Sequence, residues 1–304
     1  AAYVDTVRET LPEIPAQNVI AEPCVRDTSG AIGLAAAVLS RIDPDATMAV
    51  VTADQSIQPP ELLQGAITDA LQFTRDNPKS LITFGIQPTA PSTQYGYIKC
   101  EKAQTQPECV NPIHRVIAFR EKPDANTAQA YLDQGDYFWN SGMFVWKAKT
   151  ILGLLNTLLP ETVEPLREIQ CAWGRDDWLA TLEACFPKLP KISIDFAVME
   201  KAQHVHAIRL ACDWLDLGSF DALVEIIERD ENNNSIAASS KQLLDCHNSI
   251  IVTEDEGHLI AAIGMEDMIV AHSQNATLVC PINQAQRLKD LLEQLEQHGQ
   301  ESFL

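Results

Sequence analysis

The stretch Thr47-Met-Ala-Val-Val-Thr-Ala53 is a continuous apolar and β-branched run that ends on Asp54. A run without polar alternation predicts a strand buried on both faces, as in a parallel sheet. Pro59 and Pro60 begin an amphipathic helix that closes at Asn77-Pro78, and residues 80–86 form a second buried strand. Buried strands alternating with helices of about 10–15 residues predict an α/β, Rossmann-like sheet with helices on both faces.

The same pattern extends in both directions along the chain. Asp27 or Thr28 is positioned to cap an alanine- and leucine-rich helix over residues 31–39. Further strands are predicted over residues 114–120, 140–146 and 205–211, with helices over 126–132 and 195–202 and several short helices within 150–190.

The sequence pattern changes after Asp230. Glu231-Asn-Asn-Asn-Ser235 is rich in turn residues, and it is followed by short strands predicted at 236–238, 249–252, 259–263, 268–271 and 277–279. This spacing predicts a small β-solenoid-like region. Residues 281–297 form an amphipathic helix, with Leu288 to Leu295 on one face. The sequence thus predicts two domains, residues 1–230 and residues 231–304.

Composition limits the classes of partner. The chain has 304 residues and a formal net charge of −20. Such an acidic surface repels phosphate backbones, and the longest apolar stretches fall short of the roughly 20 residues that span a bilayer. We therefore expect no nucleic-acid and no membrane partner. Eight cysteines without a C-x-x-C pair predict reduced, buried thiols in a cytoplasmic protein.

Acidic residues close two of the apolar strands. Ligands bind at the carboxyl ends of strands in open α/β sheets, so Asp54 and Asp216 are candidate ligands of magnesium, with Lys122 as a phosphate partner. The spacing alone leaves another interpretation open, in which both aspartates cap the helices that follow. Glu121 and Lys122 likewise fit an exposed pair before a proline turn.

A resemblance favours the first interpretation. The chain resembles mannose-1-phosphate guanylyltransferases in the order and spacing of six segments: residues 22–28 (EPCVRDT), 91–98 (PSTQYGYI), 119–123 (FREKP), 139–144 (WNSGMF), 193–201 (SIDFAVMEK) and 214–219 (WLDLGS). It implies a reaction in which the phosphate oxygen of mannose-1-phosphate attacks the α-phosphorus of GTP, and pyrophosphate leaves. Such a reaction needs positioning and charge neutralisation by Mg²⁺ and no protein nucleophile.

The resemblance also implies roles for individual residues. Asp54 and Asp216 correspond to the metal-binding carboxylates, and Lys122 corresponds to the residue that holds the sugar phosphate. The sugar is bound by a set of residues around a glycine that lets the backbone approach it: Gly96, Glu121, Asn140 and Asp195. Arg26, Asp27 and Thr28 occupy the position of the guanine-side loop.

Two departures from the family pattern stand out. Gln55 replaces the usual histidine, which puts in doubt a role of that position in the pyrophosphate half-reaction. The G-G-x-G-T-R loop that cradles the triphosphate, and the first βα unit around it, have no counterpart in the sequence. Three explanations stay open: a truncated chain, a first segment not included in this sequence, or a natural inactive homologue.

The sequence therefore predicts a cytoplasmic, magnesium-dependent nucleotidyltransferase that makes GDP-mannose from GTP and mannose-1-phosphate. We expect a homodimer formed through the C-terminal region, because its apolar helix face and its short strands need a partner surface, either in the same chain or in another. Two alternatives remain: a related enzyme with another nucleotide or sugar-1-phosphate, and a non-catalytic protein that binds sugar nucleotides.

Overall fold

The computed structural model describes residues 3–101, 110–218, 220, 226–300 and 303. The chain divides into two compact units, one of Ala1–Ala53 with Ile57–Asp213 and one of Asp54–Ser56 with Trp214–Leu304. The second unit thus begins before the predicted boundary at residues 230 and 231. The last residue of the 214–219 motif, Ser219, lies outside the described residues. So does Cys109.

A mixed six-stranded sheet forms the centre of the first unit, in the order β1-β6-β3-β7-β5-β4. Its strands are β1 (Thr47–Val50), β3 (Leu81–Ile86), β4 (Gly96–Cys100), β5 (Ile113–Arg120), β6 (Tyr137–Lys147) and β7 (Val205–Leu210). Only the β3–β7 pair among these strands is parallel; the other pairs are antiparallel, and β4 pairs with both β5 and β6.

The prediction for residues 47–53 was partly wrong. β1 ends at Val50, is the edge strand of the sheet, and runs antiparallel to β6. Met48 is the one buried residue of β1 and Ala49 is exposed, so the apolar run identified a strand but not burial on both faces. The stretch predicted at 80–86 is confirmed as β3, in which every residue is buried.

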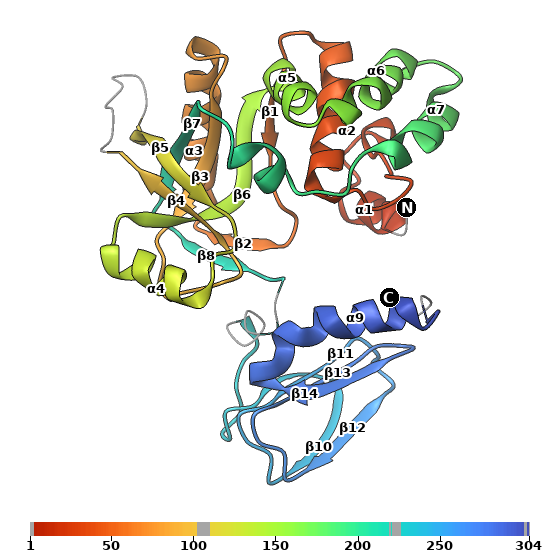
Figure 1. Ribbon diagram of the computed structural model, residues 1–304. Helices are drawn as coiled ribbons and strands as arrows, with labels where there is room; N and C mark the ends of the chain where they lie inside the picture. The colour runs from red at the N-terminus through yellow and green to blue at the C-terminus, as the bar shows by residue number, and fades with distance from the viewer. Residues whose placement is uncertain (1–2, 102–109, 219, 221–225, 301–302, 304) are drawn as a thin grey trace. The chain divides into compact units, whose positions relative to one another are not determined.

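Helices lie on both faces of the sheet, as predicted. One layer contains α2 (Asp27–Ile42), α5 (Ala148–Leu158), α6 (Val163–Ala172) and α7 (Trp178–Cys185), and it shares a core cluster with Trp146 and Val205. The next residue on β7, His206, instead contacts Phe73 of α3 (Pro60–Asp76). Successive strand residues point to opposite faces, so α3 covers the other side (Figure 1).

The connecting elements follow local sequence signals. α4 (Ala125–Gln134) begins after Asp124, whose side chain caps Thr127 N, and ends at Gly135, which has φ +73°. α2 begins at Asp27, four residues before the predicted start, and has no side-chain cap. The predicted helix at 195–202 is a short π-helix, η4 (Asp195–Met199). The remaining short elements are α1 (Val4–Thr10), η1 (Ala16–Asn18), η2 (Pro160–Thr162) and η3 (Phe186–Lys188).

The second unit is a β-solenoid, as predicted. β9 (Ser235–Ala237), β11 (Ile250–Thr253) and β13 (Met268–His272) form one parallel ladder, and β10 (Ser240–Leu244) with β12 (Leu259–Ile263) forms another. β14 (Thr277–Pro281) pairs antiparallel with β13. The chain then continues through η5 (Ile282–Arg287) into α9 (Leu288–Gln297), drawn in blue in Figure 1.

A two-stranded sheet pairs β2 (Gln55–Gln58) with β8 (Asp213–Asp216), and most of its residues belong to the second unit.

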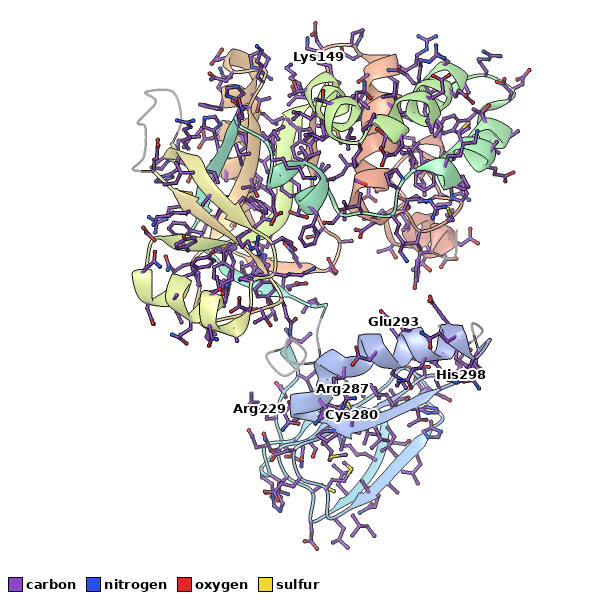
Figure 2. All side chains as sticks on the ribbon, in the orientation of Figure 1. Lys149, Arg229, Cys280, Arg287, Glu293 and His298 are labelled. Atoms are coloured by element: carbon purple, nitrogen blue, oxygen red, sulfur yellow. The ribbon has the colours of Figure 1, made fainter. Side chains whose placement is uncertain are left out.

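Exposed ion pairs contribute little to stability because solvent screens them. An example is the pair between Asp45 and Lys149, and Lys149 is labelled at the start of α5 in Figure 2. Across the described residues, no helix is both long and apolar enough to cross a membrane.

Candidate active site

Asn140 on β6 is the centre of a buried hydrogen-bond network in the first unit. Its Oδ1 accepts a hydrogen bond from Thr83 Oγ1 at 2.6 Å, and its Nδ2 donates to Asp195 Oδ1 at 3.0 Å. The side chain is buried, so each of these bonds offsets the cost of removing a polar group from water. β3, β6 and the first residue of η4 are thereby connected through polar side chains.

Glu121 follows directly after β5 and turns into the same region. Its backbone N–H donates to Glu200 Oε1 at 2.9 Å, and only 8% of its side chain is exposed. Its Oε2 is buried and has no hydrogen-bond partner among the described residues. Burial of Glu121 contradicts the exposed pair that the pattern alone allowed.

Gly96, the first residue of β4, makes room for that carboxylate. A Cβ atom at this position would lie 2.4 Å from Glu121 Oε2 and 3.4 Å from Asn140 Cβ. Gly96 is also the ladder partner of Asn140. The absent side chain therefore lets Glu121 and Asn140 occupy one small space above the strand.

Burial dominates the electrostatics of the two carboxyl groups. It raises the pKa of Glu121 to about 7; the charge of Asp195 raises it further, and Lys122 opposes the shift. Burial raises the pKa of Asp195 to about 6, against the lowering effects of Lys122 and of the hydrogen bond from Asn140. Both groups thus titrate close to neutral pH. There, a protonated carboxyl group can donate a hydrogen bond to a ligand, and an ionised one can accept a hydrogen bond from it.

Lys122 lies between this cluster and solvent. Its Nζ is 3.5 Å from Glu121 Oε1, and half of its side chain is exposed. Its φ angle is +44°, and it is the one residue with a positive φ among those described that is neither glycine, aspartate nor asparagine. Such a conformation is unfavourable for lysine, so the surrounding turn holds it in place.

The segment Arg26 to Thr28 packs beside Asp195. Thr28 Oγ1 accepts the backbone N–H of Ile194 at 2.8 Å, and the charge of Asp27 contributes to the raised pKa of Asp195. The guanidinium of Arg26 donates from Nε to the Pro187 carbonyl at 3.0 Å. The predicted guanine-side residues are thus in the first unit together with the predicted sugar-side residues.

Asp54 and Asp216 come together through the backbone of the second unit. Leu217 N donates to the Asp54 carbonyl at 2.9 Å, and β2 pairs with β8. Gln55, in place of the expected histidine, accepts the indole N–H of Trp214 at 3.0 Å and so holds the two segments together. Asp54 does not cap α3, because β2 intervenes and Pro59 is the N-cap residue.

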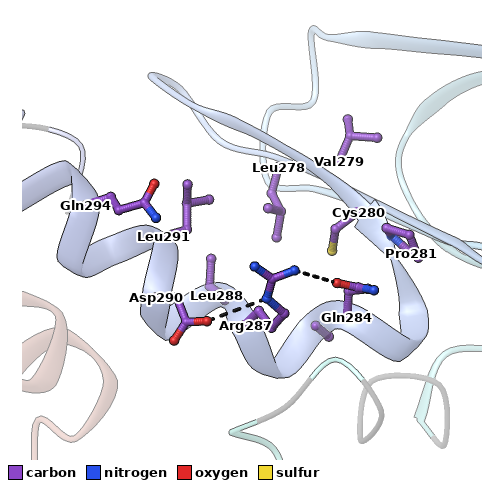
Figure 3. Close-up of a pocket in the computed structure, with 11 residues that line it drawn as sticks. Leu278, Val279, Cys280, Pro281, Gln284, Arg287, Leu288, Asp290, Leu291 and Gln294 are labelled. Atoms are coloured by element: carbon purple, nitrogen blue, oxygen red, sulfur yellow. Dashed lines mark hydrogen bonds and ion pairs between the residues drawn. The ribbon is translucent and has the colours of Figure 1, made fainter.

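A surface groove in the second unit contains none of the predicted site residues. β14, η5 and α9 line it, and Leu278, Cys280 and Leu291 are among its apolar residues (Figure 3). Its Arg287 donates to Gln284 Oε1 at 3.0 Å and pairs with Asp290. The groove's arginine is therefore engaged by neighbours within the same helical segment.

Two residues of the cluster were missed from sequence. Thr83 is the single hydroxyl residue in the buried strand β3, which is a signal that it has a hydrogen-bond partner. Glu200 lies within the 193–201 motif, but nothing in its spacing indicates that it accepts the Glu121 N–H. Among the cysteines, the predicted burial was wrong for Cys171, which is exposed, whereas Cys185 and Cys246 are buried.

Two family models match the chain. The family model described as nucleotidyl transferase matches residues 5–233. The chain belongs to the nucleotidyl transferase family. A second model, described as a MannoseP isomerase/GMP-like β-helix domain, matches residues 242–295 and covers much of the solenoid.

Its curated relatives carry more specific names. A mannose-1-phosphate guanylyltransferase of Klebsiella pneumoniae is 36% identical over 94% of this chain, and one of Escherichia coli is 35% identical over 94%. The chain spans 59% of the length of each of these two relatives. A solved structure titled mannose-1-phosphate geranyltransferase, from Thermus thermophilus, is also similar, with 25% identity and a TM-score of 0.75. The match covers 97% of this chain and 90% of the chain in that structure.

The raised pKa of Glu121 gives a stability prediction for Glu121→Gln. The folded protein holds this proton more tightly than the unfolded chain, whose glutamate has its ordinary pKa of 4.5. The stabilisation is therefore complete below about pH 4.5 and is lost as the pH rises through about 7. Between pH 5 and pH 8 the wild type should lose on the order of 2 kcal/mol more unfolding free energy than the variant.

Urea unfolding of both proteins at the two pH values measures this difference. Glu183→Gln, which removes an exposed glutamate on α7, is the matched control and should follow the wild type. Equal losses of stability in the wild type and Glu121→Gln would show that Glu121 is ionised at little cost.

Proposed function

We propose that this protein transfers GMP from GTP to mannose-1-phosphate, giving GDP-mannose and pyrophosphate. The observation that carries the proposal is the buried cluster of Glu121, Asn140 and Asp195, in which one carboxylate oxygen lacks a hydrogen-bond partner among the described residues. The names of the curated relatives, mannose-1-phosphate guanylyltransferases, support it.

The chemistry of the cluster suits a sugar. Asn140 uses one N–H and one oxygen lone pair within the protein, which leaves one donor and one acceptor for a ligand. Glu121 Oε2 can accept a hydrogen bond from a sugar hydroxyl, and this bond would remove the cost of burying an oxygen without a partner. Several hydroxyls on a neutral ring can satisfy these groups together, whereas an anion would be repelled by the two carboxyl groups.

Lys122 is positioned to hold the phosphate of that sugar. Its half-exposed ammonium group lies beside Glu121, so a sugar bound to the cluster presents its phosphate to the lysine. In the reaction, a phosphate oxygen of mannose-1-phosphate forms the new bond to the α-phosphorus of GTP. The bond from that phosphorus to the bridging oxygen breaks, and the electron pair leaves with pyrophosphate.

Asp54 and Asp216 are the residues we assign to magnesium. Carboxylate oxygens are the ligands that this ion takes from proteins, and the Leu217–Asp54 backbone bond keeps the two segments adjacent. When bound, the ion neutralises charge on the phosphates of the nucleotide. The chain's own residues hold the reactants: Lys122 binds the phosphate, and the cluster around Asn140 orients the sugar.

Two further predictions belong to this proposal. We infer a homodimer through the C-terminal region, because Leu291 and Leu292 of α9 are 43% and 38% exposed and offer an apolar face. A cytoplasmic location fits the substrates proposed and the free thiols of the described cysteines.

The first test is an assay of the full protein with Mg²⁺. Pyrophosphate release is measured with GTP, ATP, UTP and dTTP, each against mannose-1-phosphate and glucose-1-phosphate. We expect turnover with GTP and mannose-1-phosphate. Turnover with a non-guanine nucleotide alone would identify a related enzyme of other specificity. GDP-mannose binding in calorimetry without turnover on any nucleotide would identify a non-catalytic binding protein.

The metal assignment predicts that Asp216→Asn reduces the magnesium-dependent rate roughly 100-fold or more, because one ionic ligand is lost. Asp213→Asn on the same strand is the matched control and should change the rate less than about 3-fold, since Asp213 is exposed and points away from the Asp216 face. The rate is measured as a function of Mg²⁺ concentration, with the thermal transition of each variant recorded. A normal rate in Asp216→Asn would remove this residue from the metal site.

The close approach of Glu121 to Gly96 predicts that Gly96→Ala weakens binding of the sugar phosphate with little effect on the stability of the protein. In Gly96→Ala the new methyl group displaces the carboxylate of Glu121, which is the end of a flexible side chain. We expect a stability change within about 1 kcal/mol and a rise in KM for the sugar phosphate of about 10-fold, the cost of one hydrogen bond to a charged group.

Gly153→Ala is the control for this substitution. Gly153 lies inside α5 with no atom within 4 Å of the added Cβ, so alanine should stabilise the helix slightly and leave KM unchanged. Unchanged KM in Gly96→Ala would mean that the Glu121 carboxylate does not contact the sugar.

A further inference from the structure

A second group of metal-type side chains lies in the solenoid. Asp255, His258 and His272 each offer one ligand atom, and these three atoms lie within 4.8 Å of one another. All three residues are half-buried. None of them belongs to the residues assigned above to nucleotidyl transfer, and the three lie within the second unit.

The backbone holds the three residues in fixed positions. β11 and β13 pair parallel, with Thr253 opposite His272. In the turn that follows β11, Asp255 N donates to Thr253 Oγ1 at 3.0 Å, and His258 N donates to the Asp255 carbonyl at 3.2 Å. Asp255 and His258 thus come from a closed turn, and His272 comes from the end of the adjacent strand.

The three side chains lie close to one another. The imidazole rings of His258 and His272 are stacked, with centroids 3.7 Å apart and planes 15° apart. His272 Nδ1 is 2.9 Å from Thr277 Oγ1; when Nδ1 donates its proton there, the Nε2 lone pair is left for a metal. Asp255 Oδ1 accepts the Gly257 N–H at 2.9 Å, so Oδ2 remains for coordination within the described part of the chain.

We propose that Asp255, His258 and His272 bind one Zn²⁺ ion, with a water molecule or an external ligand in the fourth position. Two imidazoles and one carboxylate are a donor set typical of zinc, whereas magnesium and calcium take oxygen ligands. Tetrahedral zinc with bonds of about 2.0–2.1 Å separates its ligand atoms by roughly 3.4 Å. Imidazole lone pairs lie in the plane of the ring, so one of the two nearly parallel rings must rotate for both nitrogens to face a single ion.

The position of the site defines its effect. A solenoid coil contacts only its neighbours, so its stability depends on the interfaces between successive coils. A zinc ion bound here joins the turn after β11 to the end of β13, two successive rungs of one ladder. Zinc binding therefore links the two rungs and raises the unfolding temperature of the solenoid.

Calorimetric titration of the full chain with Zn²⁺, in excess Mg²⁺, tests the proposal. We expect one equivalent of Zn²⁺ to bind, and the apparent affinity to fall at least 10-fold in His258→Ala, His272→Ala and Asp255→Asn. His114→Ala removes a half-buried histidine in the first unit and is the matched control, which should bind like the wild type. Bound Co²⁺ should lack the charge-transfer band of thiolate ligation, which separates this site from the free cysteines.

A second measurement keeps the test independent of folding defects. The thermal transition of each variant is recorded with EDTA and with Zn²⁺, and each variant is compared with itself. We expect a zinc-induced rise in the wild type and in His114→Ala that is lost in the three site variants. Absence of equimolar binding, equal affinity in the site variants, or a thiolate band in the cobalt spectrum would each overturn the proposal.

Discussion

The constraint on which the first unit depends is the burial of two carboxyl groups beside one lysine. A carboxylate removed from water is costly unless it is paired or hydrogen-bonded. Glu121 and Asp195 share the half-exposed Lys122 as a cationic neighbour, and they repel each other when both are ionised. The protein reduces this cost with the amide of Asn140 and by raising both pKa values toward neutrality.

That constraint connects the site to the register of the sheet. Asn140 pairs with Gly96 on β4 and with Gly85 on β3, and β3 shifts register between Thr83 and Gly85. A slip of one residue would turn Asn140 to the opposite face and leave Asp195 without its amide donor. The two glycines matter for the same reason, since a Cβ on Gly85 would meet Phe138 at 3.1 Å and one on Gly96 would meet the carboxylate.

Sequence periodicity predicts elements well where one physical cause acts alone. The helix after Pro59 and the strand at 81–86 were both found, because helix initiation by proline and burial on two faces leave clear patterns. Strand direction does not leave such a pattern, so the antiparallel pairing of β1 could not be found. β10 was missed because its sequence, Ser240-Lys-Gln-Leu-Leu244, is mostly polar and exposed.

In the candidate site, too, some features could be predicted from the sequence and others could not. Resemblance supplied the residues of the sugar cluster, but the burial of Glu121 depends on Gly96 and Glu200, which lie 25 and 79 positions away. The stacking of His258 on His272 could not be predicted from the sequence for a similar reason. The two residues meet because β11 and β13 pair in successive coils of the solenoid. One apolar cluster of the solenoid has Ile251, Ile260 and Val270 at its centre. Parallel ladder pairing joins β11 to β13, so a single ion bound between these two rungs would act on the interface that holds them together.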